Sequence, residues 1–430
     1  MSGLVKDNVF GSSGTVAAAA GGLSWDTAVV TGSTVTVEAG NGYFINTTSN
    51  ACTITLPSSA EAGDQIILID YLRTWGTNAI TIDSNGLNFQ GSPDTYTVDY
   101  DTAGQSINLV YADSTNGWIP TSDITNAFDH TAPVTQKALF AYGNTGSSSL
   151  VSMSNLVNSS GVIASDVTGV GTARDDLAAC GYGYDKAIFA YGDDGDPVSL
   201  KNLVSNSGVI AADVTGVGTV RQHTAAASYG GDKGIFAYGA NSGGSFSLSN
   251  LVNNSGVVAA DVTGVGTVRS GLTATGYGTD KAIFGYGTAA SGRVSITNLV
   301  TNLGVIGTDV TGVGTASRFK GAASYGGDKA IFGFGLNPSS AKISVTNLVN
   351  SSGVVASDVS GVGTARGLIS AASYGGDKAI FAYGDSGDTN AEGATNLSNL
   401  VNSSGVVASD VTGVGTSRFG LAAAGYSNAA

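Results

Sequence analysis

A motif of seven residues recurs six times after residue 136, at a spacing of about 48 residues. Every copy starts with Lys, carries a central Phe and ends in Gly, and the copies begin at Lys137, Lys186, Lys233, Lys281, Lys329 and Lys378. Self-similarity at such a period is typical of an array of supersecondary units. The chain from about residue 130 onward is therefore predicted to be a repeat array.

Each copy contains four short runs rich in small, β-branched and aromatic residues, separated by turn signals such as GGDK and NSSG. Such runs are typical of β-strands, and four antiparallel strands per unit at this period predict a β-propeller blade. The first run of each copy consists mainly of Ala, Gly and Ser, as expected where strands converge on a narrow axis.

The two ends of the array are complementary. The first copy starts with its second run at Lys137, and the last copy is followed by an extra first run at residues 420–426. Pairing these two orphan runs would remove open sheet edges, which are an aggregation liability. We therefore expect residues 137–430 to form a six-bladed β-propeller closed by the C-terminal strand, with a straight solenoid as the alternative.

The string GTARGLISAASYGGDKAIFAYG, residues 363–384, resembles a Kelch repeat. That repeat runs from an Arg through a small-residue strand to Tyr-Gly-Gly, an aromatic strand and a second diglycine. Here Tyr-Gly or Phe-Gly replaces the second diglycine, and the Kelch Trp after the third strand is absent. The resemblance implies propeller geometry and brings no activity with it.

The region before the array divides into three parts. Residues 24–123 alternate apolar and polar residues, which predicts an all-β module of six or more antiparallel strands, a β-sandwich or jelly-roll-like fold. Residues 124–136 are the predicted linker. Residues 1–23 are rich in Gly, Ser and Ala and are expected to be either a disordered tail or an attachment arm. The arm would contact a partner through four apolar residues, Leu4, Val5, Val9 and Phe10.

Three stretches of the predicted module, residues 54–71, 76–91 and 107–120, resemble a module of tail fibres and other appendage proteins of bacteriophages, especially marine and cyanobacterial ones. The resemblance covers about a fifth of the chain. It implies a viral structural protein located in the virion, with capsid, neck or tail proteins as partners of the N-terminal region. It also implies a homo-oligomer, a homotrimer if the protein is a tail fibre, although no coiled-coil heptads are present.

Composition excludes several classes of function. The formal net charge of −14 argues against a nucleic-acid partner, which would require a basic patch. No apolar run reaches the roughly 18 residues that a membrane span needs. The two cysteines, Cys52 and Cys180, fall in strands of different predicted domains, so we expect two buried thiols and no disulfide.

No catalytic constellation is recognisable. The two histidines, His130 and His223, cannot build a His-rich metal site, and no triad is apparent, so we expect neither an enzyme nor a cofactor. Calcium is an alternative for the acidic loops at residues 192–197 and 384–393, which do not match an EF-hand. One Asp and one Arg recur in each repeat, and we expect them to cap loops or to join blades: Asp166, Asp213, Asp261, Asp309, Asp358, Asp410, Arg174, Arg221, Arg269, Arg318, Arg366 and Arg418.

The repeats differ from one another in the insert between their second and third runs and in the residues that follow each Arg, such as Asp175 and Asp176. Alternating strand directions place both variable regions on one face. Variable loops on a rigid scaffold often carry binding surfaces, whereas unconstrained drift is the alternative. The predicted ligand-binding residues of this face are Asp193, Asp194, Asp196, Gln222, His223, Arg293, Phe319, Lys320, Asp385, Asp388, Asn390 and Glu392.

These observations favour a phage virion protein, a tail fibre or other appendage, whose propeller displays a face that binds a host-surface polysaccharide or receptor. One alternative is a purely structural capsid, neck or tail decoration protein without a host ligand. Another is a glycan-degrading tailspike, which needs a close carboxylate pair. The dense candidates for such a pair are Asp193, Asp196, Asp385 and Asp388.

Overall fold

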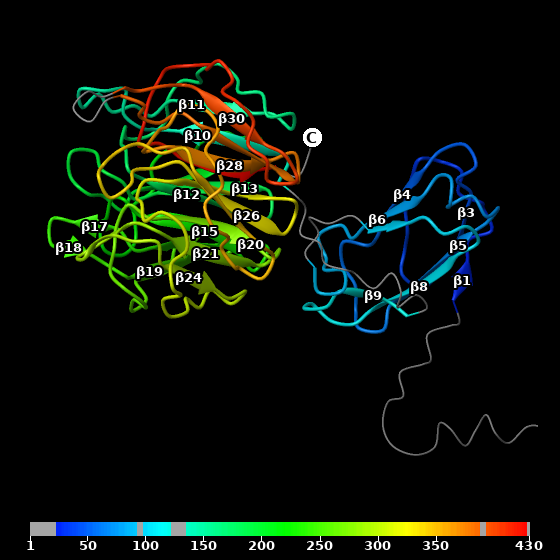
Figure 1. Cartoon of the computed structure of the whole chain (residues 1–430). Coiled ribbons are helices and arrows are strands. Elements are labelled where there is room, and N and C mark those ends of the chain that lie inside the picture. The colour runs from blue at the N-terminus through cyan, green and yellow to red at the C-terminus, as the bar shows by residue number, and fades with distance from the viewer. Residues whose placement is uncertain (1–22, 93–97, 122–134, 388–392, 428–430) are drawn as a thin grey trace, which may run out of the picture. The chain divides into compact units, whose positions relative to one another are not determined.

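The computed structural model describes residues 23–92, 98–121, 135–387 and 393–427, which form an all-β protein (Figure 1). Within these ranges the chain forms strands, turns and bends and contains no helix, hence none that could cross a membrane. The chain divides into two compact units, Met1–His130 and Thr131–Ala430. The predicted arm contacts Leu4, Val5, Val9 and Phe10 lie outside the described residues.

The first unit contains two sheets. The larger has the strand order β1 (Ser24–Trp25), β3 (Asn41–Ile45), β5 (Gln65–Asp70), β8 (Ser106–Tyr111) and β9 (Trp118–Pro120). The smaller has the order β2 (Thr34–Thr36), β4 (Cys52–Thr55), β6 (Ile80–Asp83) and β7 (Val98–Tyr100). Consecutive strands from β1 to β6 therefore alternate between the two sheets.

The expectation of antiparallel strands is wrong for the first part of this unit. The pairs β1–β3, β3–β5, β2–β4 and β4–β6 are parallel, and only the pairs formed by β7, β8 and β9 are antiparallel. Between two neighbouring strands of one sheet, such as β1 and β3, the chain forms a strand of the other sheet. The two neighbours therefore run in the same direction. Alternating hydrophobicity reports which face is buried and does not report strand direction.

Both sheets contribute to one hydrophobic core. Ile45 and Leu68 from the larger sheet and Ile54 and Ile82 from the smaller one are completely or almost completely buried. These residues occupy alternate positions of their strands, which is why the sequence alternates with period two.

The second unit contains six three-stranded sheets, one per repeat, which we number in chain order. Sheet 1 combines the C-terminal strand with the first repeat, in the order β31 (Ala422–Tyr426), β10 (Lys137–Ala141) and β11 (Ser154–Val157). The others are sheet 2, β12 (Ala178–Tyr182), β13 (Lys186–Ala190), β14 (Lys201–Val204); sheet 3, β15 (Ala225–Tyr229), β16 (Lys233–Ala237), β19 (Ser249–Val252); sheet 4, β20 (Thr273–Tyr277), β21 (Lys281–Gly285), β24 (Thr297–Val300); sheet 5, β25 (Gly321–Tyr325), β26 (Lys329–Gly333), β27 (Thr346–Val349); and sheet 6, β28 (Ser370–Tyr374), β29 (Lys378–Ala382), β30 (Ser398–Val401).

The sheets follow one another in cyclic order. The strand β31 pairs antiparallel with β10, with Tyr426 opposite Lys137. The first strands contact each other in the sequence β31, β12, β15, β20, β25, β28 and again β31. The small side chains of these strands allow this close approach, as their composition predicts. The pairing of the two orphan runs is confirmed.

The fourth run of each repeat forms isolated bridges and no regular strand, which corrects the expectation of four strands. In sheet 1 it pairs at Ile163 and at Val167 only. Between these points the buried Asn155 side chain donates hydrogen bonds to Ala164 O at 3.0 Å and to Asp166 Oδ1 at 2.9 Å. The amide of Asn155 thus satisfies groups that a regular ladder would pair.

Two short hairpins occur in the variable inserts. They are β17 (Ala240–Asn241) with β18 (Gly244–Ser245), and β22 (Thr288–Ala289) with β23 (Gly292–Arg293). They explain why the insert lengths vary without disturbing the sheets.

Candidate functional site

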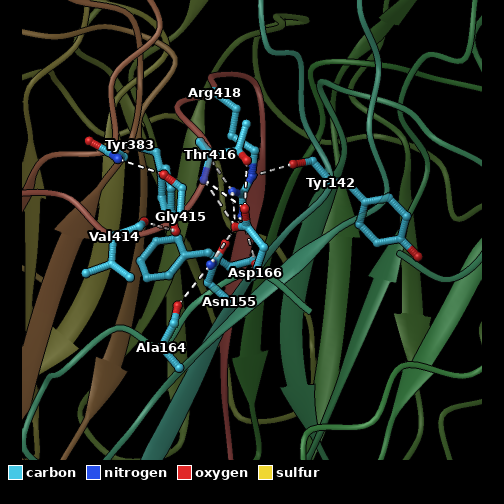
Figure 2. A network of polar contacts seen from close by, with 11 residues as sticks. Tyr142, Asn155, Ala164, Asp166, Tyr383, Val414, Gly415, Thr416 and Arg418 are labelled. Atoms are coloured by element: carbon cyan, nitrogen blue, oxygen red, sulfur yellow. Dashed lines mark hydrogen bonds and ion pairs between the residues drawn. The ribbon is translucent and has the colours of Figure 1, made fainter. Parts of the chain in front are cut away.

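A buried arginine links each pair of neighbouring sheets, with one exception. Figure 2 shows the contact between sheets 6 and 1, where the Arg418 side chain is completely buried. Its Nε donates to Tyr142 O at 2.9 Å and its Nη2 donates to Asn155 Oδ1 at 2.7 Å. Its guanidinium lies 4.3 Å from the centre of the Tyr383 ring. One cation therefore joins two repeats that are far apart in the sequence.

The recurring Asp completes this link. Asp166 accepts hydrogen bonds from the backbone N–H of Thr416 at 3.0 Å and from its hydroxyl at 2.7 Å. Burial raises the pKa of Asp166, but hydrogen bonds from Thr416 and Asn155 and the charge of Arg418 outweigh this and lower it. The carboxylate is thus held ionised against the neighbouring repeat.

The same arrangement recurs at the other sheet junctions, which confirms the structural role expected for these residues. Each arginine reaches the recurring Asn of the following sheet, in the pairs Arg174–Asn202, Arg221–Asn250, Arg269–Asn298, Arg366–Asn399 and Arg418–Asn155. A group present at five junctions is architecture and not a site of ligand chemistry.

The junction between sheets 4 and 5 is the exception, and it corrects two predictions. The segment has the same length as in the other repeats, but buried Ser317 occupies the position of the arginine and Arg318 lies one residue beyond it. Lys320, predicted on the ligand-binding face, is instead buried at a position that is Leu177 or Leu272 in other repeats.

The amine of Lys320 takes the place of the missing guanidinium. It lies 4.6 Å from the centre of the Tyr286 ring, the counterpart of the rings beneath the arginines. Its Nζ and the Oδ1 of Asn347 have no hydrogen-bond partner among the described residues. Burial lowers the pKa of Lys320 to about 8, and the charge of Asp358 offsets this only in part.

The two variable regions lie on one face, as predicted. The first residue of each insert forms a backbone bridge with the residue that follows the arginine position, as in Asp193 with Asp175, Ala240 with Gln222, and Asp385 with Gly367. The inserts and the residues after each arginine therefore form one continuous surface, which we call the variable face.

Six residues at the centre of the variable face form a connected group, which we call the hub: Asp176, His223, Gly271, Phe319, Leu368 and Gly420. Each belongs to a different repeat and has a φ between 51° and 63°. Backbone N–H groups donate from Phe319 to Gly271, from Gly271 to His223, from His223 to Asp176, from Asp176 to Gly420, and from Gly420 to Leu368. The hub follows the cyclic order of the sheets.

Three hub residues, Asp176, His223 and Phe319, have ionisable or aromatic side chains. His223 Nε2 lies 2.7 Å from Asp176 Oδ2, and the rings of His223 and Phe319 have centroids 4.9 Å apart. Burial lowers the pKa of His223, but the charge of Asp176 and its hydrogen bond outweigh this and raise it. The guanidinium of Arg318 lies 4.6 Å from the centre of the Phe319 ring.

A second carboxylate lies beside the hub. Burial and the charge of Asp176 raise the pKa of Asp175 to about 6, although a hydrogen bond from Asn144 Nδ2 at 3.1 Å acts in the opposite direction. The hub and its border therefore offer an aromatic ring, an imidazole, a guanidinium and two carboxylates within one half of the cyclic arrangement.

Two carboxylates considered for glycan cleavage, Asp193 and Asp385, form hydrogen bonds with backbone N–H groups of their own loops. Asp193 Oδ1 accepts from Gly195 N at 2.8 Å. Asp385 Oδ1 accepts from the backbone N–H of Gly387 at 2.9 Å, and its Oδ2 lies 2.9 Å from Lys342 Nζ. These contacts explain the loop geometry without a catalytic role.

The remaining predicted residues are spread over the variable face. Asp194 and Asp196 lie in one turn, and Asp194 is exposed. Gln222 forms a backbone bridge with Ala240 of an insert. Arg293 Nη2 donates to Ser340 Oγ of the next repeat at 2.8 Å. Three further predictions, Asp388, Asn390 and Glu392, lie outside the described residues. Of the predicted set, the structure places His223 and Phe319 in the hub.

Three members of the site, Asp175, Asp176 and Arg318, are not among the predicted ligand-binding residues, although the sequence already places Asp175 and Asp176 in the variable regions. Asp176 and His223 occupy equivalent positions of neighbouring repeats, so aligning the repeats and looking across them would have paired them. Arg318 was assigned to the structural set because its one-residue shift was not recognised.

Among the described residues, no three His, Cys, Asp or Glu side chains gather closely enough to hold a metal ion. Both Cys52 and Cys180 are buried free thiols, as predicted, and burial raises the pKa of Cys180 to about 12. Comparison with known protein families finds no match, and no curated protein matches the chain.

Proposed function

We propose that the second unit is a six-bladed β-propeller that serves as a binding module, and that its ligand is a host-surface glycan. The cyclic contacts of the first strands and the β31–β10 pairing support the propeller. The shared core of the two sheets in the first unit supports a β-sandwich.

The hub is the observation that carries the proposed binding activity. Five of the sheet junctions repeat the same buried arginine link, whereas the hub positions differ in chemistry from repeat to repeat. Aromatic rings beside a small number of oriented polar groups are typical of small-molecule sites. Phe319 supplies a ring for the apolar face of a sugar, and His223, Asp176 and Asp175 supply groups for its hydroxyls.

We propose binding and not catalysis. Asp176 is engaged by His223, and the carboxylates of Asp193 and Asp385 are engaged within their loops or by Lys342. A glycosidase needs one free carboxylic acid and one free carboxylate on opposite sides of the bond to be cleaved.

The virion setting is a proposal that rests on the resemblance of residues 54–120 to phage appendage modules. In this proposal the first unit attaches the protein to the particle and the second presents the variable face to the cell. A decoration protein without a host ligand is the rival, and it requires that the hub bind nothing on cells.

Adsorption to bacterial cells tests the proposal. Purified full-length protein is compared with His223→Asn and Phe319→Asn, because asparagine tolerates the positive φ of both positions. Lys233→Ala, at the start of β16 and thus at the opposite end of this strand from the variable face, is the control. We expect the two hub variants to lose adsorption and the control to retain it. Equal adsorption by all four proteins would refute the role of the hub.

A further inference from the structure

Two arginines of the variable face have no ionic partner among the described residues. Arg293 belongs to the hairpin β22–β23, and Arg318 follows the buried Ser317 of the next repeat. The other cations of this face are paired, since Lys342 and His223 contact aspartates at 2.9 Å and 2.7 Å. We call Arg293 and Arg318 the arginine pair.

Backbone contacts bring the arginine pair together. Arg293 lies opposite Thr288 in its hairpin, and Thr288 forms a bridge with Ser270. The next residue, Gly271, accepts a hydrogen bond from the N–H of Phe319, which directly follows the second arginine. The hairpin and the hub are therefore adjacent at the variable face.

The insert of the fifth repeat connects the two arginines a second time. Arg293 Nη2 donates to Ser340 Oγ of this insert at 2.8 Å. Leu336 of the same insert exchanges backbone hydrogen bonds with Arg318 at 2.9 Å and 3.0 Å. Both side chains are half-buried, so part of each remains open to the solvent.

The charges of the arginine pair are not balanced within the described residues. Burial lowers the pKa of Arg293, and the charge of Arg318 lowers it further, as expected for neighbouring cations. Burial also lowers the pKa of Arg318, and the charge of Asp176 offsets this only in part. Asp176 is already engaged by His223.

Three buried polar atoms around the arginine pair have no hydrogen-bond partner among the described residues. They are Thr288 Oγ1, Arg293 Nη1 and Arg318 Nε. Buried polar groups in proteins are nearly always hydrogen-bonded. All three groups can donate and two of them are cationic, so an acceptor with a negative charge complements them.

We propose that the arginine pair binds a carboxylate or sulfate group carried by a sugar, so that the ligand of the variable face is an acidic glycan. This inference rests on the proposed function of the hub and adds the charge of its ligand. Guanidinium groups match the paired oxygens of such anions. Arg318 also lies 4.6 Å from the centre of the Phe319 ring, so the anion would bind at the border of the hub.

Two other classes of ligand fit less well. A neutral sugar would bury two positive charges without matching them. A nucleic acid would need a row of cations along its phosphates, and the formal net charge of −14 opposes it. That net charge also repels an acidic glycan from the rest of the chain, so its binding should depend on the arginine pair.

Binding of full-length protein to immobilised polysaccharides tests the inference. The acidic probes are polygalacturonate, alginate, hyaluronate and dextran sulfate, and the neutral probes are dextran and mannan. We expect binding to at least one acidic polysaccharide and to neither neutral one. Reducing the carboxylates of the bound polysaccharide to alcohols, or removing its sulfates, should abolish the binding.

Variants then locate the contact. Arg293→Gln and Arg318→Gln should each weaken binding to the acidic polysaccharide by about tenfold or more. Lys281→Gln is the matched control, because it also removes one positive charge but lies beside Asp280 at the start of β21, away from the variable face. An unchanged calorimetric transition shows that each variant folds.

The outcomes separate this inference from the proposed function. Binding to neutral polysaccharides alone would overturn the inference and leave a glycan-binding hub in place, and so would acidic binding that both arginine variants retain. Acidic binding that depends on the arginines but survives His223→Asn and Phe319→Asn would support the inference and contradict the role of the hub. Binding to no polysaccharide would overturn both, even if inorganic phosphate alone raised the calorimetric transition.

Discussion

Replacing Lys320 by leucine should stabilise the second unit at neutral pH. Leucine occupies the equivalent position in repeats with Leu177, Leu272 and Leu421, so the backbone accommodates it. Lys320 is buried and its pKa is lowered from 10.5 to about 8. A difference of this size corresponds to about 3 kcal/mol of unfolding free energy lost when the ammonium is buried at pH 7.

The stability of the natural protein depends on pH through the lowered pKa of Lys320. Between pH 8 and pH 10.5 the unfolded chain holds the proton that the folded chain has released, so the stability of the natural protein rises with pH in this window. The advantage of Lys320→Leu should therefore be largest below pH 8 and should fade toward pH 10.5. Adding Ser317→Arg should increase stability further, since an arginine there can donate to Asn347 Oδ1 as its counterparts do.

Differential scanning calorimetry resolves the unfolding of the two units. All three tryptophans lie in the first unit, so a thermal melt followed by tryptophan fluorescence identifies the transition of that unit. The remaining calorimetric transition then belongs to the second unit. We expect the second transition of Lys320→Leu to move upward by roughly 5 °C at pH 7. A lower transition at pH 7, or a gain that stays constant up to pH 10.5, would refute the assigned cost of burying this amine.

Three further predictions concern the links between repeats and the hub. Arg269→Ala should cost about 3 kcal/mol in calorimetry because Asn298 Oδ1 loses its buried donor, whereas exposed Lys281→Ala should change little; equal effects would contradict the link. Asp175→Asn should stabilise the protein by about 1 kcal/mol above pH 6, and the gain should disappear as the pH falls toward 3.8, since protonation of Asp175 removes the cost of burying its charge and its repulsion by Asp176; a gain that persists at low pH would contradict this. Removing residues 420–430 should expose the edge of β10 and cause aggregation detectable by light scattering, and a monomeric truncated protein with an unchanged transition would show that β31 is dispensable.

The repeat array could be predicted in detail because each signal occurs several times. The motif spacing, the Ala-rich first runs and the orphan runs at Lys137 and residues 420–426 all led to the observed sheet order and the β31–β10 pair. The fourth run was misjudged because its Val and Ile content is that of a strand. Its pairing is interrupted by a side chain, Asn155 and its counterparts, which periodicity does not reveal.

In the first unit the sequence predicts the buried positions but not the direction of the strands. Its buried positions follow from alternation, and Ile54, Leu68 and Ile82 are core residues as expected. The parallel pairing could not be predicted, because a strand of either direction buries the same alternate residues. The face shared by the variable regions was predictable from strand alternation. The pairing of Asp176 with His223 was not predicted, because it joins side chains of different repeats.

The role of the hub as a glycan site is tested most directly by binding of the full-length protein to an array of bacterial surface polysaccharides, with His223→Asn and Phe319→Asn compared with Lys233→Ala. We expect the natural protein and Lys233→Ala to bind a restricted set of glycans and both hub variants to lose this binding. Binding that survives both hub substitutions, or the absence of binding to every polysaccharide together with unaltered adsorption to cells, would contradict it.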